Sequence, residues 1–239
     1  MEGSAAEAAG SAPGAPLLLE LFSGTGSIGS AFRAKGWEVI SLDVDPKAHN
    51  PTILKNILDF DVATDLQGYR RVDCIWASPP CTHYSKARTS GGPRDLQGAD
   101  ALVRKTIEIA AALGDPPIFI ENPFTGMLKG RGLLDHLRLN ALDYCAYGTP
   151  YRKRTAIWSN TSWLPARPLC CGKCGNMEKG LGKRMRHKAD AQQGSRGRSE
   201  QHFSQRDLYR IPHELCDEIA GWTTASLTGH TPLSAENAL

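Results

Sequence analysis

The chain lacks the long apolar stretches that anchor a protein in a membrane. No window of its 239 residues holds the roughly 18 uncharged apolar residues that a membrane-spanning helix requires. The opening MEGSAAEAAGSAPGAP has neither the basic start nor the apolar core of a secretion signal. These absences predict a soluble intracellular protein, in nucleus or cytoplasm, with no membrane partner.

A strong excess of charge of one sign is also missing, because the formal net charge is only +3. This value does not by itself indicate a polyanionic partner. The Lys and Arg side chains are unevenly placed, however, and gather at residues 152–154 and again at 173–210. The basic second half of the chain could lie along nucleic-acid phosphates, or it could be no more than a solvated surface.

The seven cysteines do not form the pattern of a secreted disulfide framework. Their number is odd, and Cys170, Cys171 and Cys174 crowd into one short stretch. Metal binding and catalysis are better explanations for them.

Short apolar runs begin at Leu17 and alternate with longer amphipathic segments. The runs LLLELF, WEVISLDV, VDCIWASP and PIFIENP read as parallel strands buried on both faces. SIGSAFRAK and LQGADALVRKTIEIAAALG, which lie between runs, are long enough for crossover helices. LNALDYCAYG and RKRTAIWSN follow as a terminal antiparallel hairpin at the sheet edge. The pattern predicts an α/β fold with a doubly wound, mostly parallel sheet.

The rest of the chain is predicted from composition. The expected organisation is a disordered leader at 1–16, the α/β domain at 17–163, a small Cys/Lys/Arg-rich insertion at 164–205, a helix packed on the core at 206–224 and a tail at 225–239.

A glycine loop follows the first predicted strand. In FSGTGS, Gly24 and Gly26 allow close approach of the backbone to a ligand, and Ser27 opens a helix whose amides favour negative charge. Asp43 ends the second strand about 20 residues further on, where a carboxylate can bind both ribose hydroxyls. The pattern favours an adenosine-type cofactor over a structural turn with a surface Asp.

A candidate nucleophile follows another strand. ASPPCTHYSKAR places Cys81 just past the carboxyl end of the sheet, and two prolines stiffen the turn before it. An isolated cysteine is more often a small buried hydrophobe. Here the next strand ends in ENP, which puts the carboxyl of Glu121 at the same rim, where it can protonate or hydrogen-bond a ring nitrogen. The pair favours catalysis.

In this order and spacing, FSGTGS, SPPC and ENP resemble the nucleotide-binding, nucleophile and glutamate motifs of the cytosine-5 DNA methyltransferase family. The resemblance runs from Leu17 to about Asn160 and implies a Rossmann-like fold with S-adenosylmethionine as methyl donor. It implies ribose contacts from Asp43 and adenine contacts from Asn56 and Ile57. The full set of implied cofactor residues is Phe22, Ser23, Gly24, Thr25, Gly26, Ser27, Asp43, Asn56, Ile57 and Pro79.

The resemblance also implies a chemistry for the catalytic residues. Carbon 5 of cytosine is too weak a nucleophile to be methylated unaided, so Cys81 is expected to add to carbon 6 first. Glu121 would hold N3 and the exocyclic amine, Asn122 would brace the loop, and Arg154 would stand for the first of two family arginines. Attack is impossible inside a stacked duplex, so the implied partner is DNA with a flipped or unpaired cytosine.

The chain departs from the family in two places. In YRKRTAIW the family's Gln and second Arg appear as Arg152 and Ala156, so either Arg152 and Lys153 supply the missing charge or they sit on a solvated strand edge. Only about 80 residues follow, too few for a full target-recognition domain. RNA or a nucleotide as substrate, a catalytically weak nucleic-acid-binding or regulatory relative, and a modified donor therefore remain alternatives.

The insertion carries a possible metal site. In LCCGKCGNMEKGLGKRMRHKADAQ, Cys171 and Cys174 have the two-residue gap that lets two sulfurs reach one ion, and Cys170 and His187 are further candidates. His202, Cys145 and Cys216 are the other ligands considered. A structural zinc is favoured over free thiols because an insertion without periodicity needs a cross-link. Such a basic loop would suit a DNA clamp that contacts phosphates.

Overall fold

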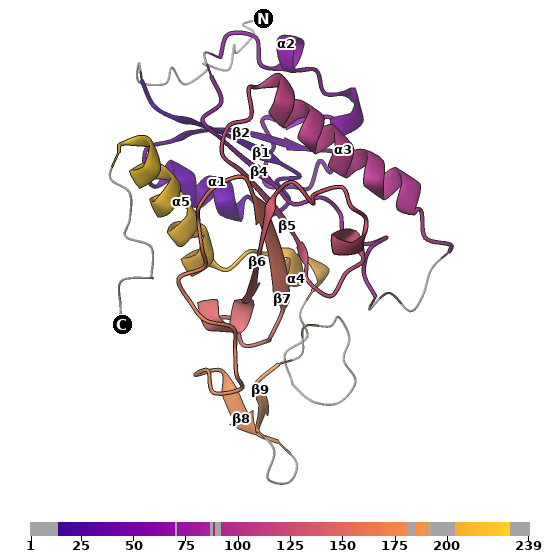
Figure 1. Ribbon diagram of the computed structural model, residues 1–239, viewed down its shortest axis with the longest axis vertical. Helices are drawn as coiled ribbons and strands as arrows, with labels where there is room; N and C mark the ends of the chain where they lie inside the picture. The colour runs from indigo at the N-terminus through magenta and orange to yellow at the C-terminus, as the bar shows by residue number, and fades with distance from the viewer. Residues whose placement is uncertain are drawn as a thin grey trace, which may run out of the picture.

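The computed structural model describes residues 14–69, 71–86, 88, 92–180, 185–189, 191 and 204–229. Its centre is a seven-stranded sheet with the order β3-β2-β1-β4-β5-β7-β6 (Figure 1). The strands are β1 (Leu17–Leu21), β2 (Glu38–Asp43), β3 (Ile53–Leu54), β4 (Cys74–Ala77), β5 (Ile118–Pro123), β6 (Arg138–Asp143) and β7 (Arg154–Ser159). The predicted α/β class with a mostly parallel sheet is confirmed.

The predicted antiparallel pair consists of β6 and β7. The later strand of the two, β7, lies inside the sheet, and the earlier strand, β6, lies at its edge. β7 pairs antiparallel with β5 on one side and with β6 on the other, so β6 alone is the edge strand. Buried residues on β7, including Ala156 and Ile157, explain why this strand is not at the edge. Its insertion beside β5 brings the segment before Arg154 close to Glu121.

Helices cover both faces of the sheet. Helix α3 (Leu96–Ala112) lies on one face, and α1 (Ser27–Arg33) and α5 (His213–Leu227) lie on the other (Figure 1). Side chains of β1 alternate accordingly: Leu19 and Leu21 pack in the core on the α3 side, whereas Leu18 packs with α1 and α5. This arrangement is what a doubly wound sheet requires, because each strand buries both its faces.

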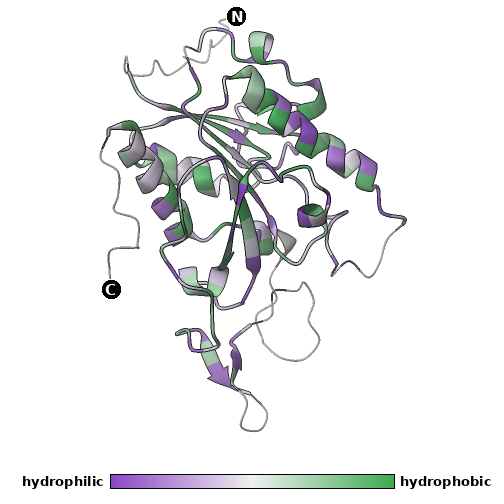
Figure 2. Cartoon of the chain, in the orientation of Figure 1, coloured by the Kyte–Doolittle hydropathy of each residue, from purple (hydrophilic) through white to green (hydrophobic). Residues whose placement is uncertain are grey.

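Short elements from both halves of the chain surround this core. These are η1 (Ile57–Asp59), α2 (Val62–Asp65), η2 (Leu128–Gly130), η3 (Tyr144–Tyr147), β8 (Met177–Lys179), β9 (Met185–His187) and α4 (Gln205–Tyr209). Strands β8 and β9 form an antiparallel ribbon that projects from the core (Figure 1). Figure 2 shows that this ribbon is mostly hydrophilic, whereas hydrophobic residues run along the interior of the sheet.

The predicted helix at 206–224 differs in its bounds. The structure has two helices here, because Pro212 lacks an N–H group and restricts Ile211 before it to an extended conformation. Helix α5 then continues to Leu227, three residues beyond the predicted helix end at residue 224. In the part of the chain that the structure describes, no helix is long and apolar enough to cross a membrane.

Candidate active site

A cavity of about 520 Å³ opens beyond the carboxyl ends of β1, β2, β4 and β5. This is where an open α/β sheet places its ligand. Nine of the predicted site residues line it, and they come from four separate stretches of sequence: Phe22, Ser23, Gly24, Thr25, Ser27, Asp43, Pro79, Cys81 and Glu121. The sheet therefore brings the glycine loop, the ribose candidate and the nucleophile candidate to one cavity.

The glycine loop is held by the residue that ends β2. The Gly24 N–H donates to Oδ2 of Asp43 at 2.8 Å, and the Asp45 N–H donates to Oδ1 at 2.9 Å. Gly26 has φ +67°, and a Cβ placed there would lie 2.6 Å from Cδ2 of His49. Gly26 is therefore required by the shape of the loop, and it does not line the cavity.

Glu20 is a cavity residue that the sequence reasoning missed. Its Oε1 accepts the Gly29 N–H at 3.1 Å, whereas Oε2 is buried with no hydrogen-bond partner among the described residues. Burial raises the pKa of this carboxyl from 4.5 to about 7. The signal in the sequence was a single acidic residue inside the apolar run LLLELF.

The predicted adenine contacts are not in the cavity. The Asn56 side chain accepts the Leu58 N–H at 3.0 Å and caps η1, and Ile57 is buried in the core on the α3 side. Neither residue lines the cavity. Val44 does, and its side chain is 67 % exposed.

Cys81 sits in a tight turn at the cavity wall. Its carbonyl accepts the N–H groups of Tyr84 (3.0 Å) and Ser85 (2.8 Å). The fully buried side chain of Asn122 donates to the Pro79 carbonyl at 2.8 Å, which ties β5 to the turn before Cys81. Burial raises the pKa of the Cys81 thiol, the carboxylate of Glu121 raises it further, and the charge of Lys153 opposes both effects.

Glu121 is held from the side of the terminal hairpin. It is 7 % exposed, and its Oε1 accepts the Tyr144 hydroxyl at 3.2 Å and lies 3.5 Å from the ammonium of Lys153. The Lys153 ammonium also donates to the Leu208 carbonyl at 3.2 Å and stacks over the Tyr144 ring. Both partners contact Oε1, and they restrain the orientation of the carboxyl.

The structure does not bring Arg154 into the cavity. Its guanidinium forms two hydrogen bonds to the buried carboxylate of Asp143, at 3.0 and 2.8 Å, and Arg152 binds the same carboxylate at 3.1 Å. Alternate residues of an extended chain point to opposite sides, so Lys153 faces the other way and lines the cavity beside Glu121. The cation near the candidate nucleophile is a lysine.

The segment around α4 contributes residues that sequence reasoning assigned only to packing. Arg206, Tyr209 and Ile211 line the cavity. The Arg206 guanidinium also donates to the Lys47 carbonyl at 3.4 Å. No spacing in the sequence predicts this contact, because it joins residues 159 positions apart.

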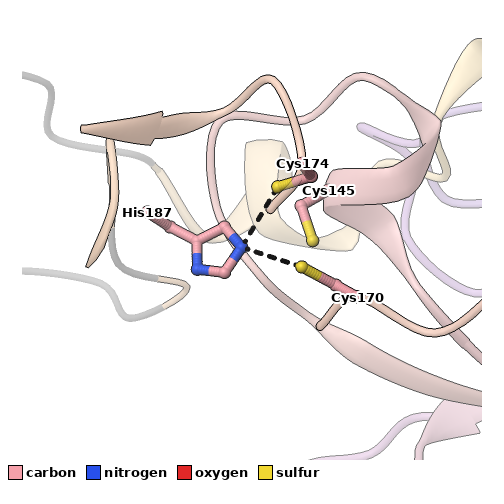
Figure 3. Close-up of side chains that lie close together, drawn as sticks. All are labelled: Cys145, Cys170, Cys174 and His187. Carbon is pink, nitrogen blue, oxygen red and sulfur yellow. Dashed lines mark hydrogen bonds between the residues drawn. The ribbon is translucent and has the colours of Figure 1, made fainter. Parts of the chain in front are cut away.

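Away from the cavity, the structure brings together three of the four predicted metal ligands, and Cys145 takes the place of the fourth, Cys171. The ligand atoms of Cys145, Cys170, Cys174 and His187 all lie within 4.8 Å of one another (Figure 3). Cys171 is exposed and is not part of this group, although it lies between Cys170 and Cys174 in the sequence. Of the alternatives considered from the sequence, Cys145 takes the fourth position, Cys216 is buried in α5, and His202 lies outside the described residues.

Comparison with known proteins points to one family. The sequence profile of the C-5 cytosine-specific DNA methylases matches residues 17–132. A Frog virus 3 (isolate Goorha) protein named "Probable DNA (cytosine-5)-methyltransferase" is 34% identical over 218 residues, which cover 84% of this chain and 97% of the viral protein. That similarity continues beyond the segment the profile covers.

Solved structures resemble the chain more distantly. The Entamoeba histolytica methyltransferase EhMeth is 17% identical with a TM-score of 0.48, over 65% of this chain and 58% of EhMeth. A mutant of Spodoptera frugiperda DNMT2 is 18% identical with a TM-score of 0.44, over 64% of this chain and 53% of DNMT2. The chain thus spans little more than half the length of these two proteins.

Proposed function

Because the chain belongs to the C-5 cytosine-specific DNA methylase family of methyltransferases, we propose that it transfers a methyl group from S-adenosylmethionine to carbon 5 of cytosine in DNA. The observation that carries the proposal is that one cavity is lined both by the glycine loop with Asp43 and by Cys81 with Glu121. A cavity of about 520 Å³ is within the usual range for a small-molecule site.

The residues of the cavity fit the donor. The Asp43 carboxylate, oriented by two backbone N–H groups, is suited to accept hydrogen bonds from ribose hydroxyls. The buried Oε2 of Glu20 needs a donor, and the ammonium group of the methionine moiety is one. We assign the adenine to the apolar surface of Phe22 and Val44, in place of Asn56 and Ile57. When bound, the donor supplies an electrophilic methyl group.

In the proposed reaction, the Cys81 thiolate adds to carbon 6 of the cytosine. The C6–S bond forms, the electron pair moves into the ring toward N3, and Glu121 stabilises the charge there through a hydrogen bond or a proton. Carbon 5, now enamine-like, takes the methyl group and would leave the donor as the neutral thioether S-adenosylhomocysteine. Loss of the carbon 5 proton to a base and elimination of the thiolate then restore the aromatic ring.

Three neighbours prepare these two residues for the reaction. Lys153 lowers the pKa of the Cys81 thiol, which favours the reactive thiolate. Tyr144 remains a hydrogen-bond donor to Glu121, because burial raises the pKa of its hydroxyl well above the ordinary value. Asn122 is a positioning residue that acts through the Pro79 carbonyl.

The target cytosine must leave the base stack of the DNA to reach the cavity. A stacked base cannot be attacked at carbon 6, so the target cytosine must be flipped out or unpaired. The ribbon of β8 and β9 carries the exposed Lys179, and Arg186 in an ion pair with Glu178, on a projection from the core, a suitable place for contacts to phosphates. We propose that this ribbon helps to hold the DNA without reading its bases.

The test is methyl transfer from labelled S-adenosylmethionine to cytosine-rich DNA, duplex and single-stranded, with RNA of matched sequence. We expect label at carbon 5 of DNA cytosine, loss of transfer in Cys81→Ser, and normal transfer in Cys171→Ser, whose exposed thiol is outside the cavity. Label in RNA alone would replace DNA as the substrate. An active Cys81→Ser enzyme would refute the role of this thiol.

The covalent step can be tested separately. With 5-fluorocytosine in the DNA, carbon 5 has no proton to lose after methylation, so elimination of the thiolate is blocked. The native protein and Cys171→Ser should then form a complex with DNA that survives denaturation, and Cys81→Ser should form none. A mechanism without a carbon 6 adduct predicts no such complex for any of the three.

A further inference from the structure

Four metal-ligating side chains converge outside the methyl-transfer cavity. The thiols of Cys145, Cys170 and Cys174 point toward the imidazole of His187 (Figure 3). We propose that they bind one structural zinc ion as a Cys₃His site. The inference does not rest on the proposed methyl transfer, because none of the four residues lines that cavity.

The separations of the ligand atoms are those of a tetrahedral site. Zinc lies about 2.3 Å from a thiolate sulfur and about 2.0–2.1 Å from an imidazole nitrogen, so a regular tetrahedron places nitrogen and sulfur about 3.6 Å apart. Nε2 of His187 is 3.5 Å from Sγ of Cys170 and 3.5 Å from Sγ of Cys174. All four ligand atoms lie within 4.8 Å of one another, so only small side-chain adjustments are needed.

The donor set selects zinc and a structural role. Thiolates and imidazole together favour zinc over the hard cations magnesium and calcium, which prefer oxygen ligands. Four protein ligands fill a tetrahedral shell and leave no position for water or substrate. The site is therefore a closed one, suited to hold the chain together.

The backbone around the cluster supports thiolate ligands. Gly172, in the turn between Cys170 and Cys174, has φ +82° and donates its N–H to Sγ of Cys170 at 3.3 Å. The Cys170 N–H donates to Oδ2 of Asp143 at 3.0 Å. Three thiolates and one zinc ion leave a net negative charge, and Asp143 holds Arg154 next to this centre as a counter-charge.

The proposed ion joins parts of the chain that are far apart in the sequence. Cys145 is in η3, directly after the edge strand of the core, and is 2 % exposed. Cys170 and Cys174 lie in a stretch without helix or strand, and His187 ends β9. One zinc ion would anchor this stretch and the projecting ribbon to the core. It would also fix the backbone beside Tyr144, which binds Glu121.

The experiment measures metal content and coordination, so it does not depend on enzyme activity. Protein purified under reducing conditions is analysed for zinc, and the metal is then exchanged for cobalt. We expect about one zinc per chain, and a cobalt derivative with the strong d–d and thiolate-to-cobalt bands of a tetrahedral thiolate site.

Variants identify the ligands. Cys145→Ser and His187→Ala should lose most of the zinc, whereas Cys171→Ser, a thiol next to the site but outside it, should keep all of it. His187→Cys should retain zinc and strengthen the thiolate-to-cobalt bands, because a fourth thiolate replaces the imidazole. If Cys145→Ser does not fold, His187→Cys and the native cobalt spectrum still decide the question.

Three results would overturn the proposal. One is native protein without bound zinc and without a tetrahedral cobalt spectrum. Another is a disulfide between cluster cysteines in protein kept reduced. The last is retention of full zinc by Cys145→Ser together with its loss from Cys171→Ser, which would restore the ligand set expected from the sequence.

Discussion

The ammonium of Lys153 lies 3.5 Å from Oε1 of Glu121, at the wall of the cavity that also contains Cys81. Arg152 and Arg154, on either side of it in the chain, both turn away to Asp143. Of the three cations at 152–154, Lys153 is therefore the one that contacts the candidate catalytic pair. Lys153 should influence the reactivity of Cys81 directly.

Replacing Lys153 by Met should slow methyl transfer by about tenfold or more at neutral pH. The positive charge lowers the pKa of the Cys81 thiol, so its removal raises that pKa and reduces the thiolate fraction. Part of the lost rate should return as the pH rises. Single-turnover rates measured across pH would show the profile of Lys153→Met displaced to higher pH.

Two variants serve as controls for this prediction. Lys153→Arg keeps the charge and should keep the native pH profile, although its rate can fall through altered geometry. Arg152→Met removes a neighbouring cation that binds Asp143 outside the cavity, and it should leave the profile in place. Equal profiles for Lys153→Met and the native enzyme would show that the lysine does not act on the thiol.

Much of the cavity could be predicted from the sequence because the fold itself brings its motifs together. Asp43, Cys81 and Glu121 are each at or just beyond the end of a buried strand, and parallel strands end at the same edge of a sheet. Recognising the strands was therefore enough to place these side chains near one another.

Other positions could not be predicted, because they depend on register or on distant contacts. Whether Lys153 or Arg154 faces the cavity depends on the register in which this segment pairs with β5. A shift of one residue in that register would move every side chain of the segment to the opposite face of the sheet. Cys145 is 25 residues before Cys170, and local Cys spacing instead suggested the exposed Cys171. The positions of Asn56 and Ile57 outside the cavity also depend on local structure, since Asn56 caps a turn of helix.

A comparison of two buried asparagines can distinguish an effect on the position of the nucleophile from an effect on the stability of the domain. Asn122 donates to the Pro79 carbonyl at 2.8 Å beside Cys81, and Asn140 donates to the Trp163 carbonyl at 3.1 Å away from the cavity. Replacing either by Ala removes a buried hydrogen bond and should cost about 1–3 kcal/mol of unfolding free energy. Only Asn122→Ala should also lower kcat, by about tenfold or more, because the turn holding Cys81 loses its support.

Urea unfolding and single-turnover rates with saturating donor would test this comparison. The two variants should have similar losses of stability but different rates. If Asn140→Ala loses as much activity as Asn122→Ala, the loss reflects destabilisation of the whole domain, and the positioning role of Asn122 is wrong.

We expect Glu20 to give the ligand-free protein a pH-dependent stability. Burial raises its pKa from 4.5 to about 7, so between these values the folded protein keeps a proton that the unfolded chain has released. The contribution of Glu20 to the unfolding free energy is therefore fully present below pH 4.5, falls by about 3 kcal/mol as the pH rises to 7, and stays constant above it. Glu20→Gln should remove this dependence.

Binding of the donor should reverse the preference of Glu20 for its protonated form. An ammonium group beside Oε2 favours the carboxylate, so binding below pH 7 must release a proton. The affinity for S-adenosylmethionine should then fall, by up to about tenfold per pH unit, from pH 7 to about pH 5.5, a range in which the ligand's own ammonium stays protonated. Calorimetry in two buffers with different ionisation enthalpies would count the released proton. Glu20→Gln should bind more weakly and release none, whereas a pH-independent affinity of the native protein would mean that Glu20 does not contact the ammonium.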